Sequence, residues 1–275
     1  MLEQNGPWGR HALTESHLDP DVGAELERRT EGTGVRIGLI RRPGRHSDQH
    51  VPKPRQVYLA HTAPERSWLE HAVIDEAKDL LDLDFTTVAA GHRPGLGTLA
   101  FDPLLFVCTN ARRDRCCAVL GRGVALSLAA VHGETVWETS HLGGHRFAPT
   151  AVLLPTGYVY GQLDATAGHH LLAAAGKDEM VLDHCRGRST WTRPGQAADL
   201  AVRRLTGETR PDAFSVVTST PAGTGRWNVE VTGMYGRFWR VTVEEGTEET
   251  PRPESCGGPA VRPSRIEVLA VDRLT

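Results

Sequence analysis

The stretch Leu104-Leu-Phe-Val-Cys-Thr-Asn-Ala-Arg-Arg-Asp-Arg-Cys-Cys117 runs from an apolar segment straight into a loop that carries cysteines. Leu104–Cys108 is short and apolar, which is typical of a buried strand. Residues 121–132 then have the composition of an apolar helix, and residues 135–139 alternate as a strand does. This part of the chain therefore predicts a strand, a loop, a helix and a second strand.

The elements further along the chain extend this unit. Residues 151–154 and 158–162 form a predicted hairpin around Pro155-Thr-Gly157, and residues 165–175 begin another helix. The resulting order, β-α-β-β-β-α, is that of the core of the thioredoxin fold. Downstream we expect a helix over 195–205, between Pro194 and Gly207, and strands at 214–218, 226–232, 237–243 and 266–271.

The residues before Leu104 indicate a separate α/β region. Residues 35–40 and 56–60 are predicted strands, and residues 65–83 carry apolar side chains at helical spacing. Residues 91–103 are rich in Gly and Pro, as a linker is. The whole chain is therefore expected to be an α/β protein.

Composition excludes several classes of protein. The 275 residues carry a net charge near −3, which gives no reason to expect nucleic acid as a partner. We expect no membrane segment, because no apolar run reaches the roughly 18–20 residues that span a bilayer. The N-terminal residues lack the features of a secretory signal, so a cytoplasmic location is expected. Five cysteines, three of them within ten residues, indicate metal or redox chemistry rather than a disulfide framework. We expect the other two, Cys185 and Cys256, to be structural.

Two pairs of metal-ligand residues follow predicted strands. Cys108 and Cys117 are separated by eight residues, and His141 and His145 by three. Thiolates and imidazoles suit iron–sulfur clusters or zinc. The wide cysteine spacing favours a cluster, because structural zinc sites usually place cysteines two to four residues apart. Between the histidines, Gly143-Gly144 disfavours a helix and allows a positive φ. Cys116 is an alternative second thiolate, and zinc or no metal remain alternatives to a cluster.

Several words of the sequence resemble the sucrase/ferredoxin-like family, a branch of the thioredoxin-like [2Fe–2S] ferredoxins. They are Gly6-Pro-Trp-Gly-Arg10, Cys108-Thr-Asn-Ala-Arg-Arg-Asp-Arg-Cys-Cys117, Ser140-His-Leu-Gly-Gly-His-Arg-Phe-Ala148, Leu153-Leu-Pro-Thr-Gly-Tyr-Val-Tyr-Gly161 and Arg186-Gly-Arg-Ser189. The resemblance implies that Cys108, Cys117, His141 and His145 ligate a [2Fe–2S] cluster, with Cys116 as a neighbour. Members usually carry a further stretch before the first word, so a first strand is expected to be missing or supplied differently.

The resemblance implies three regions. These are an N-terminal α/β domain over residues 1–100, a thioredoxin-like ferredoxin core over 101–193, and a C-terminal extension of one helix and strands over 194–275. The sequence lacks Cys-x-x-Cys, so dithiol exchange of the thioredoxin kind is not expected. Nor does it present a pair of carboxylates suited to glycoside hydrolysis.

Such a ligand set predicts proton-coupled transfer of single electrons. Two neutral imidazoles in place of two thiolates remove negative charge, which raises the reduction potential as it does in Rieske centres. We therefore expect an electron carrier or a redox component, with electron donor and acceptor proteins that the sequence does not identify. The alternatives are a structural zinc module for protein interaction and a thiol-dependent enzyme that uses Cys116 or Cys117. Four arginines flank the proposed ligands: Arg112, Arg113, Arg115 and Arg146. They either contact a cluster or an acidic partner, or belong to a solvated loop.

Overall fold

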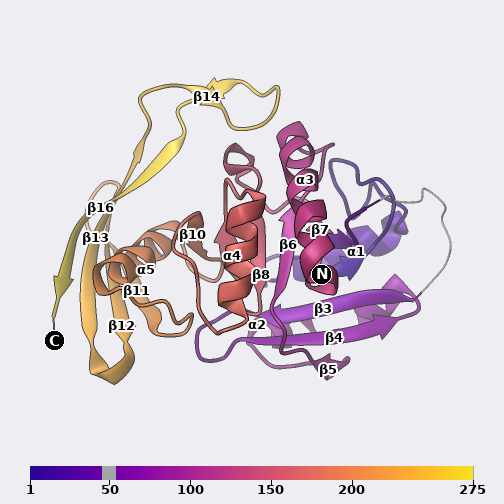
Figure 1. Cartoon of the computed structure of the whole chain (residues 1–275), viewed down its shortest axis with the longest axis horizontal. Helices are drawn as coiled ribbons and strands as arrows, with labels where there is room; N and C mark the ends of the chain where they lie inside the picture. Colours follow the sequence, from indigo (N-terminus) through magenta and orange to yellow (C-terminus); the bar gives the residue numbers. More distant parts are fainter. Residues whose placement is uncertain (45–53, 275) are drawn as a thin grey trace.

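The computed structural model describes residues 1–44 and 54–274 and has the mixed α/β architecture that the sequence predicts (Figure 1). Its largest sheet runs in the order β10-β9-β8-β6-β7-β2-β1-β3-β4-β5. The strands of this sheet are β1 Leu2–Glu3, β2 Leu39–Arg41, β3 Arg55–His61, β4 Trp68–Ile74, β5 Thr98–Leu99, β6 Leu104–Cys108, β7 Val136–Thr139, β8 Ala151–Leu154, β9 Tyr158–Tyr160 and β10 Cys185–Arg188.

The central unit has the element order predicted from the sequence. Strand β6 is followed by α3 (Arg115–His132), β7, β8, β9 and α4 (Ala165–Ala175). Strands β6 and β7 pair in parallel, whereas β8 pairs with β6 and β9 in antiparallel fashion. Helices α3 and α4 lie side by side on one face of these strands (Figure 1). This β-α-β-β-β-α arrangement confirms the expected thioredoxin-like core.

Helix α3 begins at Arg115, six residues before the helix expected over 121–132. With the following turn it forms Arg115–Thr135, the one segment in the described ranges that is long and apolar enough to cross a membrane. That property rests on length and composition alone. The inner face of the helix, which includes Val124, Ala125 and Leu128, is buried on the strands. We therefore interpret α3 as a helix that packs one face on these strands, with 28% of its apolar stretch buried.

The helix expected over residues 65–83 is wrong, because a strand of the N-terminal part of the sheet lies within this segment. Residues Trp68–Ile74 are instead strand β4, which forms an antiparallel ladder with β3, and only Ala77–Asp82 are helical, as the short 3-10 helix η1. The apolar positions fit a strand because Leu69, Ala72 and Ile74 pack into the core. Helices α1 (Pro20–Thr30) and α2 (Phe85–Ala89) complete this region, and the expected linker over 91–103 includes the edge strand β5.

The C-terminal residues form a second layer. Strands β11 (Phe214–Pro221), β12 (Arg226–Gly233), β13 (Phe238–Thr247) and β16 (Ser264–Arg273) make a four-stranded sheet. Helix α5 (Arg193–Thr206) packs on it through Ala198 and Val202, and it ends at Gly207 with a φ of 69°. Strands β14 (Arg252–Pro253) and β15 (Ala260–Val261) form a small hairpin in an arm over residues 248–263 (Figure 1). The division at residues 100 and 193 remains a prediction, and the large sheet is continuous across the first of these boundaries.

A buried polar network joins the second layer to the first. Arg203 in α5 donates to the Asp199 carboxylate at 3.0 Å and to the Tyr158 hydroxyl of β9 at 2.9 Å. The same guanidinium donates to the carbonyl of Pro211 at 2.7 Å. Because Arg203 and Asp199 are both fully buried, the charges depend on each other for compensation. The network therefore fixes α5 against the thioredoxin-like core.

Candidate metal centre

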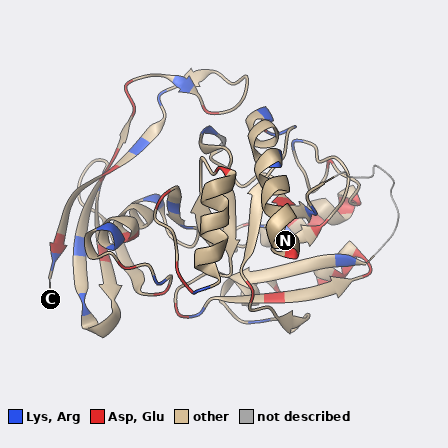
Figure 2. Ribbon diagram, viewed as in Figure 1, with Lys and Arg blue, Asp and Glu red and all other residues tan. Residues whose placement is uncertain are grey.

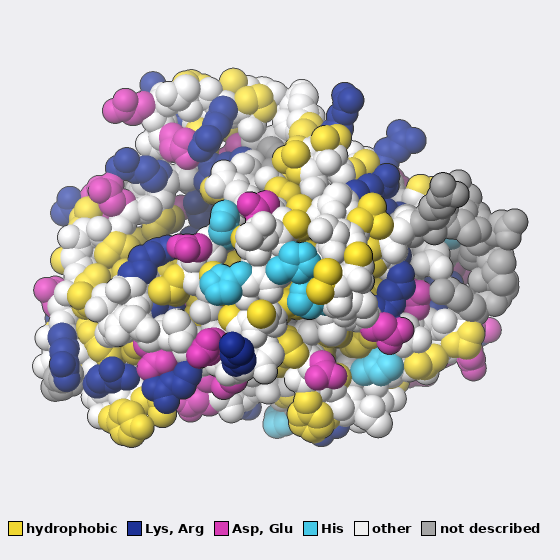
Figure 3. Space-filling view, in the orientation of Figure 1, with side chains coloured by type: hydrophobic (Ala, Val, Ile, Leu, Met, Phe, Trp, Pro, Cys, Tyr) yellow, Lys and Arg dark blue, Asp and Glu magenta, His cyan; other side chains and the backbone are white. Residues whose placement is uncertain are grey.

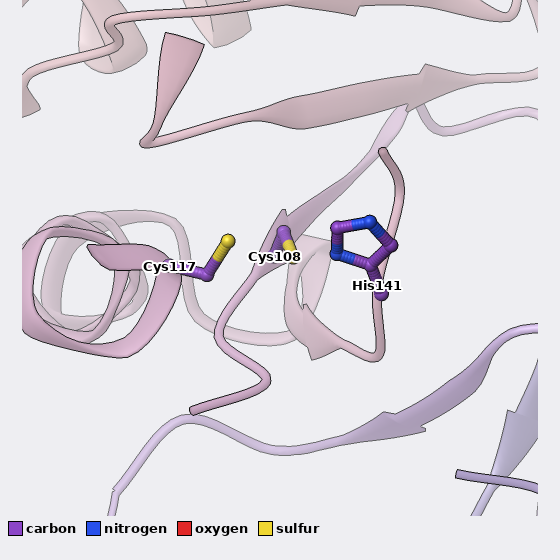
Figure 4. A group of neighbouring side chains, drawn as sticks. All are labelled: Cys108, Cys117 and His141. Carbon is purple, nitrogen blue, oxygen red and sulfur yellow. The ribbon is translucent and has the colours of Figure 1, made fainter. Parts of the chain in front are cut away.

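Three of the four proposed ligands converge at one edge of the large sheet. Cys108 is the last residue of β6, Cys117 lies in the first turn of α3, and His141 follows β7 by two residues. Their ligand atoms all lie within 4.8 Å of one another, and the side chains point toward a common centre (Figure 4). Parallel strands place their carboxyl ends at the same edge of a sheet, so β6 and β7 deliver their following residues to one place.

A glycine allows α3 to approach the end of β6. A Cβ atom on Gly121 would lie 2.4 Å from the backbone oxygen of Cys108, so any side chain here would push the helix away. The close approach brings Cys117, one turn earlier in α3, beside Cys108. Both cysteines are fully buried. The 18-residue helix also directs the positive end of its dipole toward the thiols, which favours thiolate.

The pKa values of the two buried thiols are shifted in opposite directions. The pKa of Cys108 is lowered well below its usual value, first because the Cys117 thiol donates to it and then because of His141. The pKa of Cys117 is raised by the same contact with Cys108 and by burial. Cys108 therefore loses its proton more readily than Cys117, and the thiolate is the form that binds a metal.

His141 supplies a nitrogen donor beside the two thiols. Its Nδ1 atom is buried and has no hydrogen-bond partner among the described residues. A buried polar atom without a partner is costly, so such an atom calls for an explanation such as an ion. Two thiols and an unpaired imidazole nitrogen are the donor chemistry that iron–sulfur clusters and zinc require. The described residues therefore fit a metal group.

The second histidine is placed only through its backbone. His145 begins the short 3-10 helix η3 (His145–Phe147), and its side chain lies outside what the structure describes. The loop before it follows the sequence prediction, because Gly143 and Gly144 have φ angles of 89° and 65° and no α-helix forms between the histidines. These positive φ values turn the chain back after His141, and the role of His145 as a ligand remains a prediction.

Residues near the N-terminus pack against the ligand-bearing loops. Arg41 forms a buried ion pair with Glu138 at 2.8 Å, and its guanidinium also donates to the carbonyl of Gly6 at 2.8 Å and lies over the Trp8 ring. Asn110, two residues after Cys108, donates to the carbonyl of Gly9 at 3.1 Å. The Gly6-Pro-Trp-Gly-Arg10 segment therefore packs against the loop that follows Cys108 and helps to hold it in place.

Cys116 lies outside the group of three donor atoms and interacts with Cys256 as well as with Cys117. Its backbone N–H contacts the sulfur of Cys256 at 3.5 Å, and the Cys256 N–H donates to the Asp114 carboxylate at 2.9 Å. Burial and the Cys256 thiol raise the pKa of Cys116 to about 11. Sequence reasoning treated Cys256 as an ordinary structural cysteine. Its separation from Cys116 by 140 residues gives no sequence signal for this contact.

Two other interpretations from the sequence can be placed. Cys185 is buried and accepts from the Gly187 N–H at 3.4 Å, in keeping with a structural role. Of the flanking arginines, Arg112 and Arg115 are exposed. Arg146 turns toward the second layer, where it donates to the carbonyl of Ser264 at 2.9 Å. Arg146 therefore connects the histidine loop, residues 140–147, to β16.

Comparison with known proteins agrees with this architecture. A family model described as sucrase/ferredoxin-like matches residues 1–187, a range that contains the whole candidate metal centre and stops within β10. Neither the curated proteins nor the solved structures contain a match to the chain. The family match covers more than half of the sequence, and the chain therefore belongs to the sucrase/ferredoxin-like family.

Proposed function

We propose that this protein binds one [2Fe–2S] cluster through Cys108, Cys117, His141 and His145 and transfers single electrons. The observation that carries the proposal is the group of three donor atoms within 4.8 Å of one another. The Nδ1 atom of His141 is also buried and has no hydrogen-bond partner among the described residues. Family membership supports it, because the matched range contains all four residues. When bound, such a cluster accepts and returns one electron.

The chain itself would supply charge, shielding and a proton site. Cys108 and Cys117 are fully buried, so they hold the ligand sulfurs away from water. His141 is half-buried, and the ring nitrogen that does not bind is left to hold a proton. Reduction makes that nitrogen more basic, so electron uptake is coupled to proton uptake. The potential should then fall with pH by up to about 60 mV per unit.

The free cysteines bear on the compartment and on the partners that we propose. All five cysteines are free, as is usual where glutathione and thioredoxin keep thiols reduced, and we propose a cytoplasmic protein. We propose a carrier or redox component that exchanges electrons with donor and acceptor proteins, rather than a stand-alone enzyme, and neither nucleic acid nor membrane as a partner. The thiol-dependent alternative is disfavoured, because Cys117 is fully buried and the pKa of Cys116 is raised to about 11.

Redox titration of anaerobically purified protein tests the proposal. We expect visible absorption that dithionite bleaches and a midpoint potential that falls as pH rises. The variant His141→Cys should retain a cluster, lower its potential and flatten the pH response, because a thiolate replaces a protonatable imidazole. A matched variant, His170→Cys, changes a histidine of α4 outside the metal centre and should leave both quantities unchanged. A colourless protein, or equal potentials in wild type and His141→Cys, would contradict the proposal.

A structural zinc site is the second candidate. The compactness of the three donor atoms favours it, since zinc holds its ligands in one tetrahedron with metal–ligand distances of about 2.0–2.3 Å. Zinc would leave the protein colourless and without a redox wave. Cobalt substitution would then give the visible bands of a tetrahedral site, whereas a cluster protein would lose its iron spectrum on the same treatment.

A further inference from the structure

A cavity of about 570 Å³ opens between the two layers, on the side of the histidine loop that faces the C-terminal sheet. Its walls come from η3, β10, α5, β16 and the arm. In Figure 3 this region is a hollow beneath the arm, with basic side chains on its rim. The lining residues used below are Arg146, Phe147, Arg186, Arg193, Arg204 and Glu248.

The lining carries an excess of positive charge. Five arginines and two glutamates contribute to it, and Figure 2 shows basic residues in blue on α5 and β10. Part of this charge is compensated, because Arg193 pairs with Glu245 at 3.3 Å and Arg265 pairs with Glu267. The remaining arginines have weaker compensation. Glu248 lies 3.9 Å from Arg146 and is held more closely by Arg252.

Arg146 and Arg186 hold unused hydrogen-bond donors. Their guanidinium groups lie 4.7 and 4.0 Å from the centre of the Phe147 ring, so both are anchored on one aromatic side chain. The Nη1 atom of Arg146 is buried without a hydrogen-bond partner, and no described carboxylate pairs with Arg186. Burial and the neighbouring Arg146 and Arg193 lower the pKa of Arg186. Like charges held this close favour an anion between them.

We propose that this cavity binds a small organic polyanion that carries phosphate or carboxylate groups. Guanidinium groups present paired N–H donors that match both kinds of oxyanion. The volume lies within the range of pockets for small organic ligands, roughly 300–1,000 Å³. Apolar side chains of α5 and β16, among them Leu200 and Ile266, would contact the organic part.

The cavity adjoins the metal centre through Arg186. A Cβ atom on Gly144 would lie 2.3 Å from Nη1 of Arg186, so the guanidinium lies directly against the loop between His141 and His145. Part of the cavity wall comes from residues beyond 187, outside the range of the family match. The C-terminal layer thus completes a binding site beside the centre, and the ligand site itself does not depend on which metal the centre holds.

Calorimetric titration of the purified full chain tests this site. The probes are ADP for phosphate esters and citrate for polycarboxylates, each at low ionic strength, with sodium chloride at matched ionic strength as the control. We expect at least one probe to bind with a dissociation constant below about 1 mM. Arg186→Gln should weaken binding about tenfold, which is the usual loss for one charged hydrogen bond. Arg204→Gln, at an exposed position, should weaken it about threefold.

The control variant and the contradicting results are defined by the same titration. Arg226→Gln removes an exposed arginine that does not line the cavity and should leave affinity within about twofold. If Arg186→Gln does not fold, as judged by circular dichroism, Arg204→Gln decides the question. Absence of binding by both probes, or equal affinity in Arg204→Gln and Arg226→Gln, would overturn the proposal. Failure of this test would leave the iron–sulfur proposal unaffected, because the titration does not depend on the cluster.

Discussion

The hydroxyl of Thr109 donates a hydrogen bond to the carboxylate of Glu138 at 2.9 Å, inside the protein. Thr109 follows Cys108, and Glu138 lies three residues before His141, so this bond joins the two strand ends that carry the proposed ligands. The ion pair from Arg41 to the same carboxylate compensates its buried charge. The distance between a thiol and an imidazole from separate strands thus depends on a polar group that is not itself a ligand.

Loss of Arg41 should destabilise the protein strongly. The variant Arg41→Met leaves the Glu138 charge buried without its partner, which costs about 3–5 kcal/mol of unfolding free energy. Urea denaturation measures this change. Arg240→Met removes one partner of an exposed pair with Glu230 and should cost less than about 1 kcal/mol. Equal losses in the two variants would show that Arg41 does not compensate a buried charge.

The adjacent cysteines should differ in their effect on the metal. Cys117→Ser removes a sulfur that lies within 4.8 Å of the other donor atoms and should abolish or strongly alter the visible spectrum. Cys116→Ser changes a thiol that interacts with Cys256 and Cys117 but lies outside the group of donor atoms, and it should leave the spectrum intact. Metal content and absorption of both variants check the assignment. The opposite pattern would make Cys116 the second thiolate.

Two glycines of α3 provide a matched pair. Gly121→Ala places a methyl group 2.4 Å from the Cys108 carbonyl oxygen, so helix and strand must separate. We expect lower thermal stability and weaker metal retention. Gly123→Ala meets nothing within 4 Å and should raise helix stability by up to about 1 kcal/mol. Comparable stability and metal content in the two variants would contradict the close approach of α3 to β6.

The Asp199 carboxyl should give stability a measurable pH dependence. Burial raises its pKa to about 6, whereas the carboxyl of an unfolded chain titrates near 3.9. The folded state therefore binds the proton more tightly, and this group stabilises the fold below about pH 4 and loses that contribution as pH rises through about 6. Asp199→Asn cannot titrate. We expect the unfolding free energy of wild type, relative to this variant, to fall between pH 4 and 7. A difference that is constant with pH would contradict the raised pKa.

The sequence predicts elements well where the signal is local. The apolar run Leu104–Cys108 is bounded by a loop on each side, and Ala165–Ala175 is rich in helix formers, so both ranges agree with the structure. The expected helix over 65–83 is wrong because the apolar residues there fit either periodicity. These residues form a strand because β3 pairs with them and satisfies the hydrogen-bonding groups of their backbone. That partner is not evident in a window of sequence.

The candidate site divides in the same way. Cysteine and histidine spacing after two predicted strands is enough to bring Cys108, Cys117 and His141 together, since parallel strands share an edge. Contacts across the fold carry no such signal. Cys256, in the arm, lies beside Cys116. Arg186 lies against the loop between His141 and His145 and comes from β10, the edge strand of the large sheet. Sequence spacing therefore identifies three candidate ligands that the fold brings together, and only the folded chain shows the cavity beside them.

The most direct test of the account is metal and sulfide analysis of protein purified without oxygen. We expect two iron atoms and two acid-labile sulfides for each chain, and their loss in Cys108→Ser, because Cys108 carries the most acidic thiol of the centre. One equivalent of zinc with neither iron nor sulfide in the wild-type protein would contradict it.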